Sequence, residues 1–255
     1  MSGNKANDMR IAIVTGAARG IGFATAFKLL GLGHRVVFVD TILPDLNDLP
    51  QTLKANADTA QLDITDHSAS QALITRLLDQ YGQIDILVNN AGISLKNRQG
   101  RSNGILEASI EEVQKMLDVN VLAMFRWCQY VLPGMKAQRW GRIVNVSSLA
   151  GRTLAHVAGP AYMLTKSAVL GLSRGIATEM GEFGITTNCI APGRIQTDMA
   201  KLASCESNRA YAERIPVKRL GQPQEVATAI AYLCSEEAGF TNGAVIDVNG
   251  GSFMC

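Results

Sequence analysis

The sequence predicts a single doubly wound α/β domain, in which a seven-stranded parallel sheet carries helices on both faces. Two observations favour this fold class. Short runs rich in β-branched residues alternate with longer stretches of helical periodicity along the 255 residues. No proline- or serine-rich linker, low-complexity tract or tandem repeat divides the chain, so we expect one domain over residues 1–255, with right-handed crossovers between its strands.

The strands are expected where apolar runs are short and bounded by polar or glycine-containing turns. RIAIVT has the composition of a buried strand, ADTAQLD is only weakly apolar, and IDILVNNAG ends in polar and small residues. In chain order, the expected strands are residues 10–15, 35–40, 57–63, 84–92, 141–148, 185–193 and 243–251.

The helices are expected between these strands, most of them with a start or stop signal of their own. Glycines lie near the end of the first helix and at the end of the second, Pro133-Gly134 marks the end of the third, and Pro160 suits the first turn of the fourth. The expected helices are residues 20–33, 68–82, 109–132, 160–182 and 223–238.

The composition excludes several function classes. Apolar residues make up 47% of the chain and charged residues 18%, which is a globular balance, and the net charge of +2 is too small to indicate a nucleic-acid or membrane partner. Residues 1–9 form a polar tail that lacks the apolar core of a secretory signal, and no apolar run reaches the roughly 18 residues of a membrane span. We therefore expect a cytoplasmic protein.

The cysteines and histidines argue against disulfides and metal. The five cysteines are scattered and form no C-x-x-C motif, so we expect free thiols in a reducing cytosol. The three histidines show no ligand spacing, so no metal is expected.

A glycine-rich turn, TGAARGIG, lies between the first strand and the first helix. Gly16, Gly20 and Gly22 let the main chain turn tightly and approach a ligand, while the helix N-terminus offers N–H groups and partial positive charge to a pyrophosphate. The residues alone also fit an ordinary turn. Their place at the first junction of a doubly wound pattern favours dinucleotide binding.

The end of the second strand carries the residue that distinguishes the two nicotinamide dinucleotides. A carboxylate at Asp40 would accept hydrogen bonds from the adenosine ribose and would repel a 2′-phosphate, which favours NAD over NADP. Arg19 is the counter-argument, because a cation in the glycine turn could pair with that phosphate.

Tyr162 and Lys166 are spaced by about one helical turn, which places a phenol and an ammonium on one face of the fourth helix. A neighbouring cation lowers the pKa of a phenol, so the pair is suited to proton transfer. The spacing alone is equally compatible with a surface pair.

With these motifs in order, the chain resembles the short-chain dehydrogenase/reductase family in its main branch of about 250 residues. The resemblance covers about residues 10 to 251 and implies a Rossmann fold, a nicotinamide cofactor and the interconversion of alcohols and carbonyls. It rests on TGAARGIG (15–22), LDIT (62–65), NNAG (89–92), DVN (118–120), VSSLAG (146–151), YMLTK (162–166), APGRIQT (191–197) and VNGG (248–251).

The resemblance assigns catalytic roles by matching position. Tyr162 is expected to be the general acid/base, and Lys166 its electrostatic partner and a ligand of the nicotinamide ribose. Ser148, which fits S-x-x-G where Ser147 does not, is expected to bond the reacting oxygen, although its interval to the tyrosine is fourteen residues in place of the usual thirteen. Asn120 is a poor mid-helix residue, and the resemblance implies a local distortion there that holds a water linked to the lysine.

The cofactor contacts carried over by the same likeness lie after several strands. Asn89 is expected to tie neighbouring strands together, Ala91 and Gly92 to admit the cofactor, and Thr197 to bond the carboxamide. The full expected set is Gly16, Arg19, Gly20, Ile21, Gly22, Asp40, Asp63, Ile64, Asn90, Ala91, Gly92, Tyr162, Lys166, Pro192, Gly193, Ile195 and Thr197.

Three segments differ from a minimal family member. The loop at 94–104 carries Lys96, Arg98 and Arg101 and no acid, so it either recognises an anionic substrate group or is a solvated loop or subunit contact. Residues 198–216 occupy the place of the substrate lid. The loop at 152–160, with Arg152 and His156, is expected to face the substrate.

The expected function is that of an NAD(H)-dependent oxidoreductase acting on a secondary alcohol or its ketone, a small and possibly anionic molecule. A 3-oxoacyl-thioester reductase using NADPH is the alternative, indicated by IPVKRLGQPQEVA, and a catalytically inactive cofactor-binding regulator is an alternative of another class. The family likeness also implies a homotetramer, with the closing strand between subunits.

Overall fold

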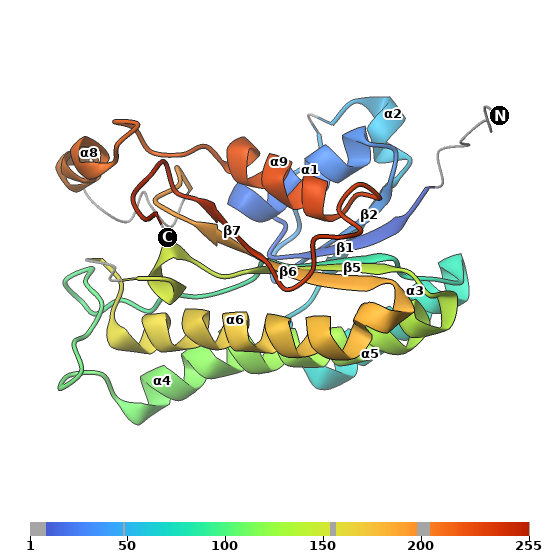
Figure 1. The fold of residues 1–255 in the computed structure, drawn as a ribbon, viewed down its shortest axis with the longest axis horizontal. Helices are drawn as coiled ribbons and strands as arrows, with labels where there is room; N and C mark the ends of the chain where they lie inside the picture. The colour runs from blue at the N-terminus through green and yellow to red at the C-terminus, as the bar shows by residue number, and fades with distance from the viewer. Residues whose placement is uncertain (1–8, 48, 154–156, 198–204, 255) are drawn as a thin grey trace.

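A seven-stranded parallel sheet organises the computed structural model, which describes residues 9–47, 49–153, 157–197 and 205–254. Its spatial order is β3-β2-β1-β4-β5-β6-β7 (Figure 1). The strands are β1 (Ile11–Thr15), β2 (Arg35–Asp40), β3 (Ala57–Gln61), β4 (Ile86–Asn89), β5 (Gly141–Val146), β6 (Ile185–Pro192) and β7 (Val245–Val248). The predicted doubly wound class is therefore confirmed.

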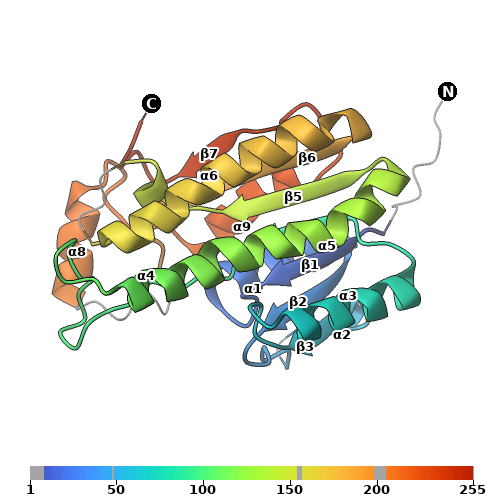
Figure 2. The same ribbon diagram turned by 90° about the horizontal axis from the view of Figure 1, so that it is seen from below.

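Helices cover both faces of this sheet, as Figures 1 and 2 show from two directions. On one face lie α1 (Gly20–Gly31), the short α2 (Gln51–Lys54) and α9 (Pro223–Leu233). On the other lie α3 (His67–Tyr81), α4 (Ile110–Leu117), α5 (Ala123–Gln138) and α6 (Pro160–Met180). A further helix, α8 (Cys205–Arg214), lies at one end of the molecule. No helix among these described segments is long and apolar enough to cross a membrane.

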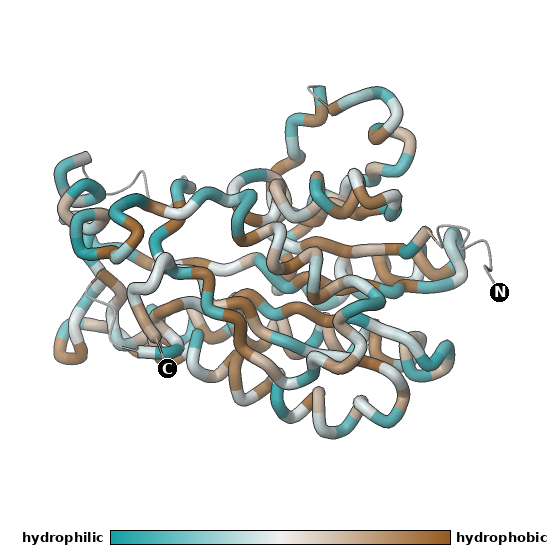
Figure 3. The backbone as a smooth tube through the Cα atoms, turned by 45° about the horizontal axis from the view of Figure 1, so that its top comes forward, coloured by the Kyte–Doolittle hydropathy of each residue, from teal (hydrophilic) through white to brown (hydrophobic). Residues whose placement is uncertain are grey.

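The hydrophobic core is double because each central strand is buried on both faces. On β1, Ala12 and Val14 pack into the cluster that includes Leu29 and Ile230, whereas Ile13 packs into the opposite cluster with Trp127. Figure 3 shows hydrophobic residues concentrated along the central strands. Burial on both sides fixes the register of the strands and hence the positions of the loops that follow them.

The predicted end of the helix at 109–132 is wrong. A π-helical turn, η1 (Asp118–Leu122), interrupts this helix where a local distortion is expected, and the helix does not end at Pro133 but continues to Gln138. Val131 and Met135 are buried on its sheet-facing side, and this packing outweighs the backbone hydrogen bond that the proline cannot donate. The helix ends instead at Arg139, which has a left-handed φ of 57°.

Candidate active site

The predicted site residues meet at one edge of the sheet because they follow the carboxyl ends of parallel strands. The glycine turn follows β1, Asp40 ends β2, and Asn90 follows β4. Ser148 follows β5, and Gly193 follows the end of β6. In an open parallel sheet this edge is where ligands bind.

The glycine turn is so closely packed at Gly16 and Gly22 that side chains are excluded at these two positions. A Cβ on Gly22 would lie 2.1 Å from the carbonyl oxygen of Gly16, and a Cβ on Gly16, whose φ is +65°, would lie 2.8 Å from the Cα of Ala91. Asn90 locks the turn by donating from Nδ2 to the carbonyls of Thr15 and Gly16, both at 3.0 Å. The N-terminus of α1 has no side-chain cap and no acidic residue in its first turn. It therefore has the form and polarity of a phosphate site.

The Asp40 carboxylate lies directly against this turn. Its Oδ2 accepts a hydrogen bond from the main-chain nitrogen of Ala18 at 2.9 Å, and its Oδ1 accepts from the nitrogen of Thr41 at 2.7 Å. Arg19 is the next residue of the same turn, so the acid and the cation that favour different dinucleotides lie at the same place in the fold.

Two further predicted cofactor contacts, Asp63 and Ile64, follow β3. Asp63 is exposed, and its Oδ1 accepts from the main-chain nitrogen and the hydroxyl of Thr65. The carbonyl of Ile64 accepts from the indole nitrogen of Trp127 at 3.4 Å. These contacts fix the loop at the same edge of the sheet as the glycine turn.

Asn120 is fully buried in the π-helical turn, where its amide binds three groups. Its Oδ1 accepts from the main-chain nitrogen of Ile93 at 2.8 Å, and its Nδ2 donates to the Ile93 carbonyl at 2.9 Å and to the Thr165 hydroxyl at 3.1 Å. The local distortion expected from the asparagine is therefore present. It joins the long helix to the loop after β4 and to α6.

Lys166 is buried beside Asn120. Its Nζ donates to the carbonyl of Val146 at 2.9 Å, and a Cβ on Gly92 would lie 3.2 Å from that Nζ and 3.1 Å from Asn120 Oδ1. The main chain at Gly92 thus passes closely by both side chains. Burial lowers the pKa of Lys166 from 10.5 to about 8.

Tyr162 and Ser148 complete the group. The Lys166 Nζ lies 5.8 Å from the centroid of the Tyr162 ring. Burial raises the pKa of Tyr162, and a hydrogen bond with the Ser148 side chain opposes that rise. The predicted lowering of this pKa by the lysine is therefore wrong, because desolvation of the phenol dominates and the ammonium is directed to Val146.

Two residues that sequence reasoning missed hold this group in place. The Thr165 hydroxyl accepts from Asn120 and donates to the carbonyl of Tyr162 at 2.9 Å. The Ser147 hydroxyl donates to the carbonyl of Lys166 at 2.7 Å. A signal for Thr165 was available, because it lies three residues after Tyr162 and one before Lys166, within the quoted YMLTK segment.

The segment after β6 packs at the same edge of the sheet, between the chain that follows β7 and the glycine turn. A Cβ on Gly193 would lie 2.9 Å from the Cα of Asn249, so Pro192-Gly193 packs tightly on the chain after β7. Ile195 is buried. A Cβ on Gly20 would lie 3.3 Å from the Thr197 methyl group, so Thr197 lies against the glycine turn.

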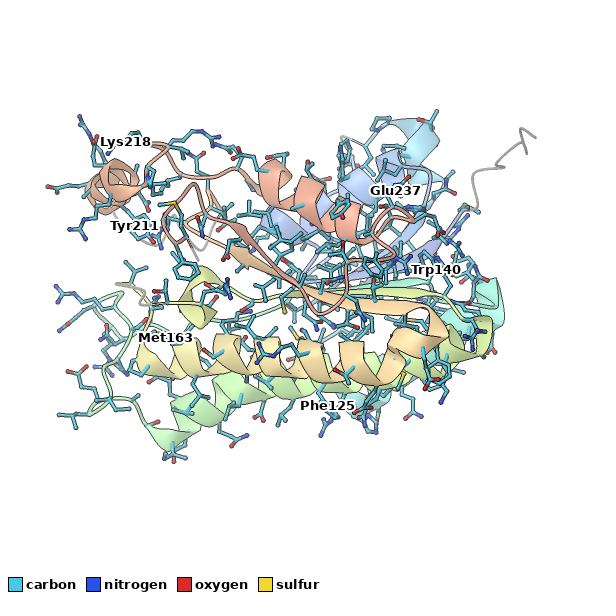
Figure 4. The ribbon with its side chains drawn as sticks, viewed as in Figure 1. Phe125, Trp140, Met163, Tyr211, Lys218 and Glu237 are labelled. Atoms are coloured by element: carbon cyan, nitrogen blue, oxygen red, sulfur yellow. The ribbon has the colours of Figure 1, made fainter. Side chains whose placement is uncertain are left out.

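The structure describes only part of the three segments in which the chain differs from a minimal family member. His156 and residues 198–204 of the expected lid lie outside the described residues, and residues 205–214 form α8. Figure 4 places Tyr211 of α8 and Met163 of α6 at the same end of the molecule. Arg152 forms an ion pair with Asp247 at 3.0 Å.

The chain matches known oxidoreductases over nearly its whole length. Residues 16–252 match the family described as enoyl-(acyl carrier protein) reductase. The 3-oxoacyl-[acyl-carrier-protein] reductase FabG of Vibrio cholerae is 36% identical over 245 residues, which are 96% of this chain and 98% of that protein.

Solved structures share the fold as well. A 3-oxoacyl-[acyl-carrier protein] reductase from Brucella melitensis with bound NAD is 36% identical, with a TM-score of 0.86 and coverage of 96% of this chain and 92% of that one. ElxO with NADP bound is 30% identical, with a TM-score of 0.87 and coverage of 96% and 98%.

Proposed function

Because this chain belongs to the short-chain dehydrogenase/reductase family, whose members are NAD(P)-dependent oxidoreductases acting on CH–OH and ketone groups, we propose that it interconverts a 3-oxoacyl compound and its 3-hydroxy product. One observation carries the chemistry: Asn120, Ser148, Tyr162 and Lys166 are gathered at one edge of the sheet. The names of the relatives support the 3-oxoacyl class over the general secondary alcohol that the sequence alone favoured.

The residues present fit a nicotinamide dinucleotide. The glycine turn and the uncapped N-terminus of α1 would hold the pyrophosphate, Asp40 the adenosine ribose, and Asp63 and Ile64 the adenine. Lys166 and Tyr162 would hold the nicotinamide ribose, with Thr197 at the carboxamide. When bound, the cofactor supplies the hydride.

Residues of the chain itself supply the proton for the reduction. In reduction, Ser148 and Tyr162 donate hydrogen bonds to the carbonyl oxygen, and Tyr162 transfers its hydroxyl proton to that oxygen as the carbonyl carbon is reduced. The raised pKa means that the phenol holds its proton at neutral pH until the carbonyl oxygen accepts it. Lys166, held between Val146 and Gly92, stabilises the tyrosinate that remains.

The proposed cofactor is NADH. Asp40 lies where it would accept from the ribose hydroxyls, and a 2′-phosphate placed there would meet this carboxylate. Arg19 supports NADPH as the runner-up. Relatives of both kinds exist, since one structural neighbour holds NAD and another NADP.

We also propose a homotetramer in the cytoplasm, with α8 as part of the substrate lid. Apolar side chains are exposed on the sheet-covering helices, including Phe125 at 46% and Leu164 at 52%, and Phe240 near β7 is fully exposed. Association of subunits would cover such surfaces. The described Cys128, Cys189 and Cys234 are free thiols, which suits a reducing compartment.

A direct assay tests this function. The N-acetylcysteamine thioester of 3-oxobutanoate is offered with NADH and, separately, with NADPH, and the loss of nicotinamide absorbance is followed. We expect turnover with a kcat/KM for NADH at least about tenfold above that for NADPH, because the 2′-phosphate would face Asp40. A preference for NADPH would overturn the cofactor assignment, and no turnover with either cofactor would overturn the 3-oxoacyl assignment.

A further inference from the structure

The turn that carries Ser148 is held against α6 on one side. The Ser148 Oγ accepts from the main-chain nitrogen of Ala150 at 3.1 Å, and the Gly151 nitrogen donates to the Ser148 carbonyl at 2.9 Å. A Cβ on Gly151 would lie 2.5 Å from the carbonyl oxygen of Lys166, so the turn lies directly against α6 there. The turn ends at Arg152, whose contacts reach a different part of the sheet.

Arg152 connects the end of this turn with β7. Its Nε donates to the Asp247 Oδ1 at 3.3 Å and its Nη2 to the Oδ2 at 3.0 Å, which makes a forked ion pair. Because β6 lies between β5 and β7, the pair lies across the carboxyl-terminal end of β6 (Figure 1). Asp247 is the register partner of Ala191, which comes directly before Pro192-Gly193. The pair therefore joins the turn to the strand ends that carry predicted cofactor contacts.

This ion pair is largely shielded from water. Only 21% of the Arg152 side chain and 18% of the Asp247 side chain are exposed. The Phe253 ring covers the guanidinium, whose carbon lies 5.2 Å from the ring centroid. Solvent and salt weaken a shielded pair less than an exposed one. The pair is thus suited to hold the end of the turn in one place.

Phe253 is itself held by a tight bend after β7. The buried Asn249 donates from Nδ2 to the Phe253 carbonyl at 3.1 Å and accepts at Oδ1 from the Gly251 nitrogen at 2.9 Å. Gly250 and Gly251 have φ values of +65° and +86°, which favour glycine. A Cβ on Gly250 would lie 2.7 Å from the Val217 Cγ2, so the bend packs on the chain after α8. The ring that covers the guanidinium is therefore anchored.

The segment between the two expected catalytic hydroxyls has a second anchor at its other end. Lys96, the half-buried cation of the loop after β4, donates to the Val157 carbonyl at 3.2 Å. Along the chain, Val157 lies nearer to Tyr162 than to Ser148. Arg152 lies nearer to Ser148. The contacts of Arg152 therefore act on the serine end of this segment.

We propose that Arg152 is a positioning residue for Ser148. Its pair with Asp247, beneath the Phe253 ring, holds the turn so that the serine hydroxyl stays beside Tyr162. This inference rests on the proposed function, because it states how a residue of the same site is held. A misplaced hydrogen-bond donor lowers the rate of the chemical step, whereas the dinucleotide still binds.

The test uses four variants and one control. Arg152→Gln, Asp247→Asn and the variant with both changes remove the pair, and Arg152→Lys keeps the positive charge without the fork. The control is Arg219→Gln, which breaks the forked pair of Arg219 with Glu225 at an exposed position. The measurements are kcat for the 3-oxobutanoyl thioester, the NADH dissociation constant, and the hydrogen exchange of the main-chain amides of residues 150–153.

In Arg152→Gln we expect kcat to fall about tenfold or more and the turn amides to exchange about tenfold faster or more, while the NADH dissociation constant changes less than about twofold. Asp247→Asn should act in the same direction. The double variant should lose no more than the worse single variant, because both changes break one pair. Arg152→Lys should recover part of the loss, and Arg219→Gln should resemble the wild type.

Hydrogen exchange separates this inference from the reaction proposed above, because it needs no substrate. If the wild type reduces no 3-oxoacyl thioester, the 3-oxoacyl assignment fails, and faster exchange of the turn in Arg152→Gln still supports the positioning role. Unchanged exchange would overturn that role for any substrate. Faster exchange with unchanged kcat would overturn it too, as would a loss of kcat accompanied by weaker NADH binding. If Arg152→Gln does not fold, Asp247→Asn gives the same comparison.

Discussion

The amide of Asn120 holds the main chain of Ile93 from both sides, accepting from its nitrogen at 2.8 Å and donating to its carbonyl at 2.9 Å. A side chain at the π-helical turn thereby fixes the loop that leaves β4. That loop continues past Gly92, beside Lys166, to Lys96. The geometry of the candidate site thus depends on one buried amide.

The first prediction is that Asn120→Leu destabilises the protein by about 2–4 kcal/mol, because the half-buried main chain of Ile93 would lose two hydrogen bonds and the buried Thr165 hydroxyl would lose one. Urea denaturation measures the change. Gln114→Leu is the matched control, since it replaces an exposed amide on the adjoining α4 and should cost less than about 0.5 kcal/mol. Equal effects of the two changes would contradict the role given to Asn120.

The second prediction concerns the glycine turn. Gly22→Ala should destabilise the protein by about 3 kcal/mol or more and abolish dinucleotide binding, because the new Cβ would meet the Gly16 carbonyl at 2.1 Å. Gly31→Ala in the same helix has open space and should be neutral or stabilising by up to about 1 kcal/mol. Thermal unfolding and NADH fluorescence report the two effects, and a Gly22→Ala protein that binds NADH normally would refute the packing argument.

The third prediction follows from the pKa of Lys166, which burial lowers from 10.5 to about 8. Between these values the unfolded chain binds more protons than the folded one, so the stability contributed by this residue rises with pH. Compared with Lys166→Met, the wild type should gain about 1.5 kcal/mol between pH 8 and pH 9.5. Urea denaturation at the two pH values measures this, and a stability difference independent of pH would be the contrary result.

The fourth prediction concerns cofactor choice. Asp40→Asn keeps an acceptor oxygen for the main-chain nitrogen of Ala18 and removes the negative charge that would repel the 2′-phosphate of NADPH. The ratio of kcat/KM for NADPH to kcat/KM for NADH should therefore rise about tenfold or more. Asp63→Asn removes an exposed carboxylate after the next strand and should leave this ratio unchanged, because the two dinucleotides share the adenine. If both variants change the ratio alike, general charge and not the position of Asp40 governs the preference.

The features most readable from the sequence were those with strong local rules. Alternating apolar runs predicted the parallel sheet, and the glycines at 16, 20 and 22 predicted a tight turn, in which a Cβ on Gly16 or Gly22 would clash. The poor helix propensity of Asn120 needs a reason, and the family resemblance implies the local distortion that is the π-helical turn.

Other features depend on packing that no local pattern records. The helix runs through Pro133 because Val131 and Met135 are buried against the sheet. The pKa of Tyr162 is set by burial, which cannot be inferred from a four-residue spacing. In the irregular loop at 94–104 no periodicity tells which of the three cations is directed inward.

The central claim is that the Tyr162 hydroxyl transfers the proton to the substrate. The dinucleotide binds at the same site but does not need this hydroxyl in order to bind. Tyr162→Phe removes only that oxygen, and the measurement is NADH binding together with single-turnover reduction of the 3-oxobutanoyl thioester. We expect the NADH dissociation constant to stay within about threefold and turnover to fall at least about 100-fold. A variant that retains more than a tenth of the wild-type turnover would contradict the account.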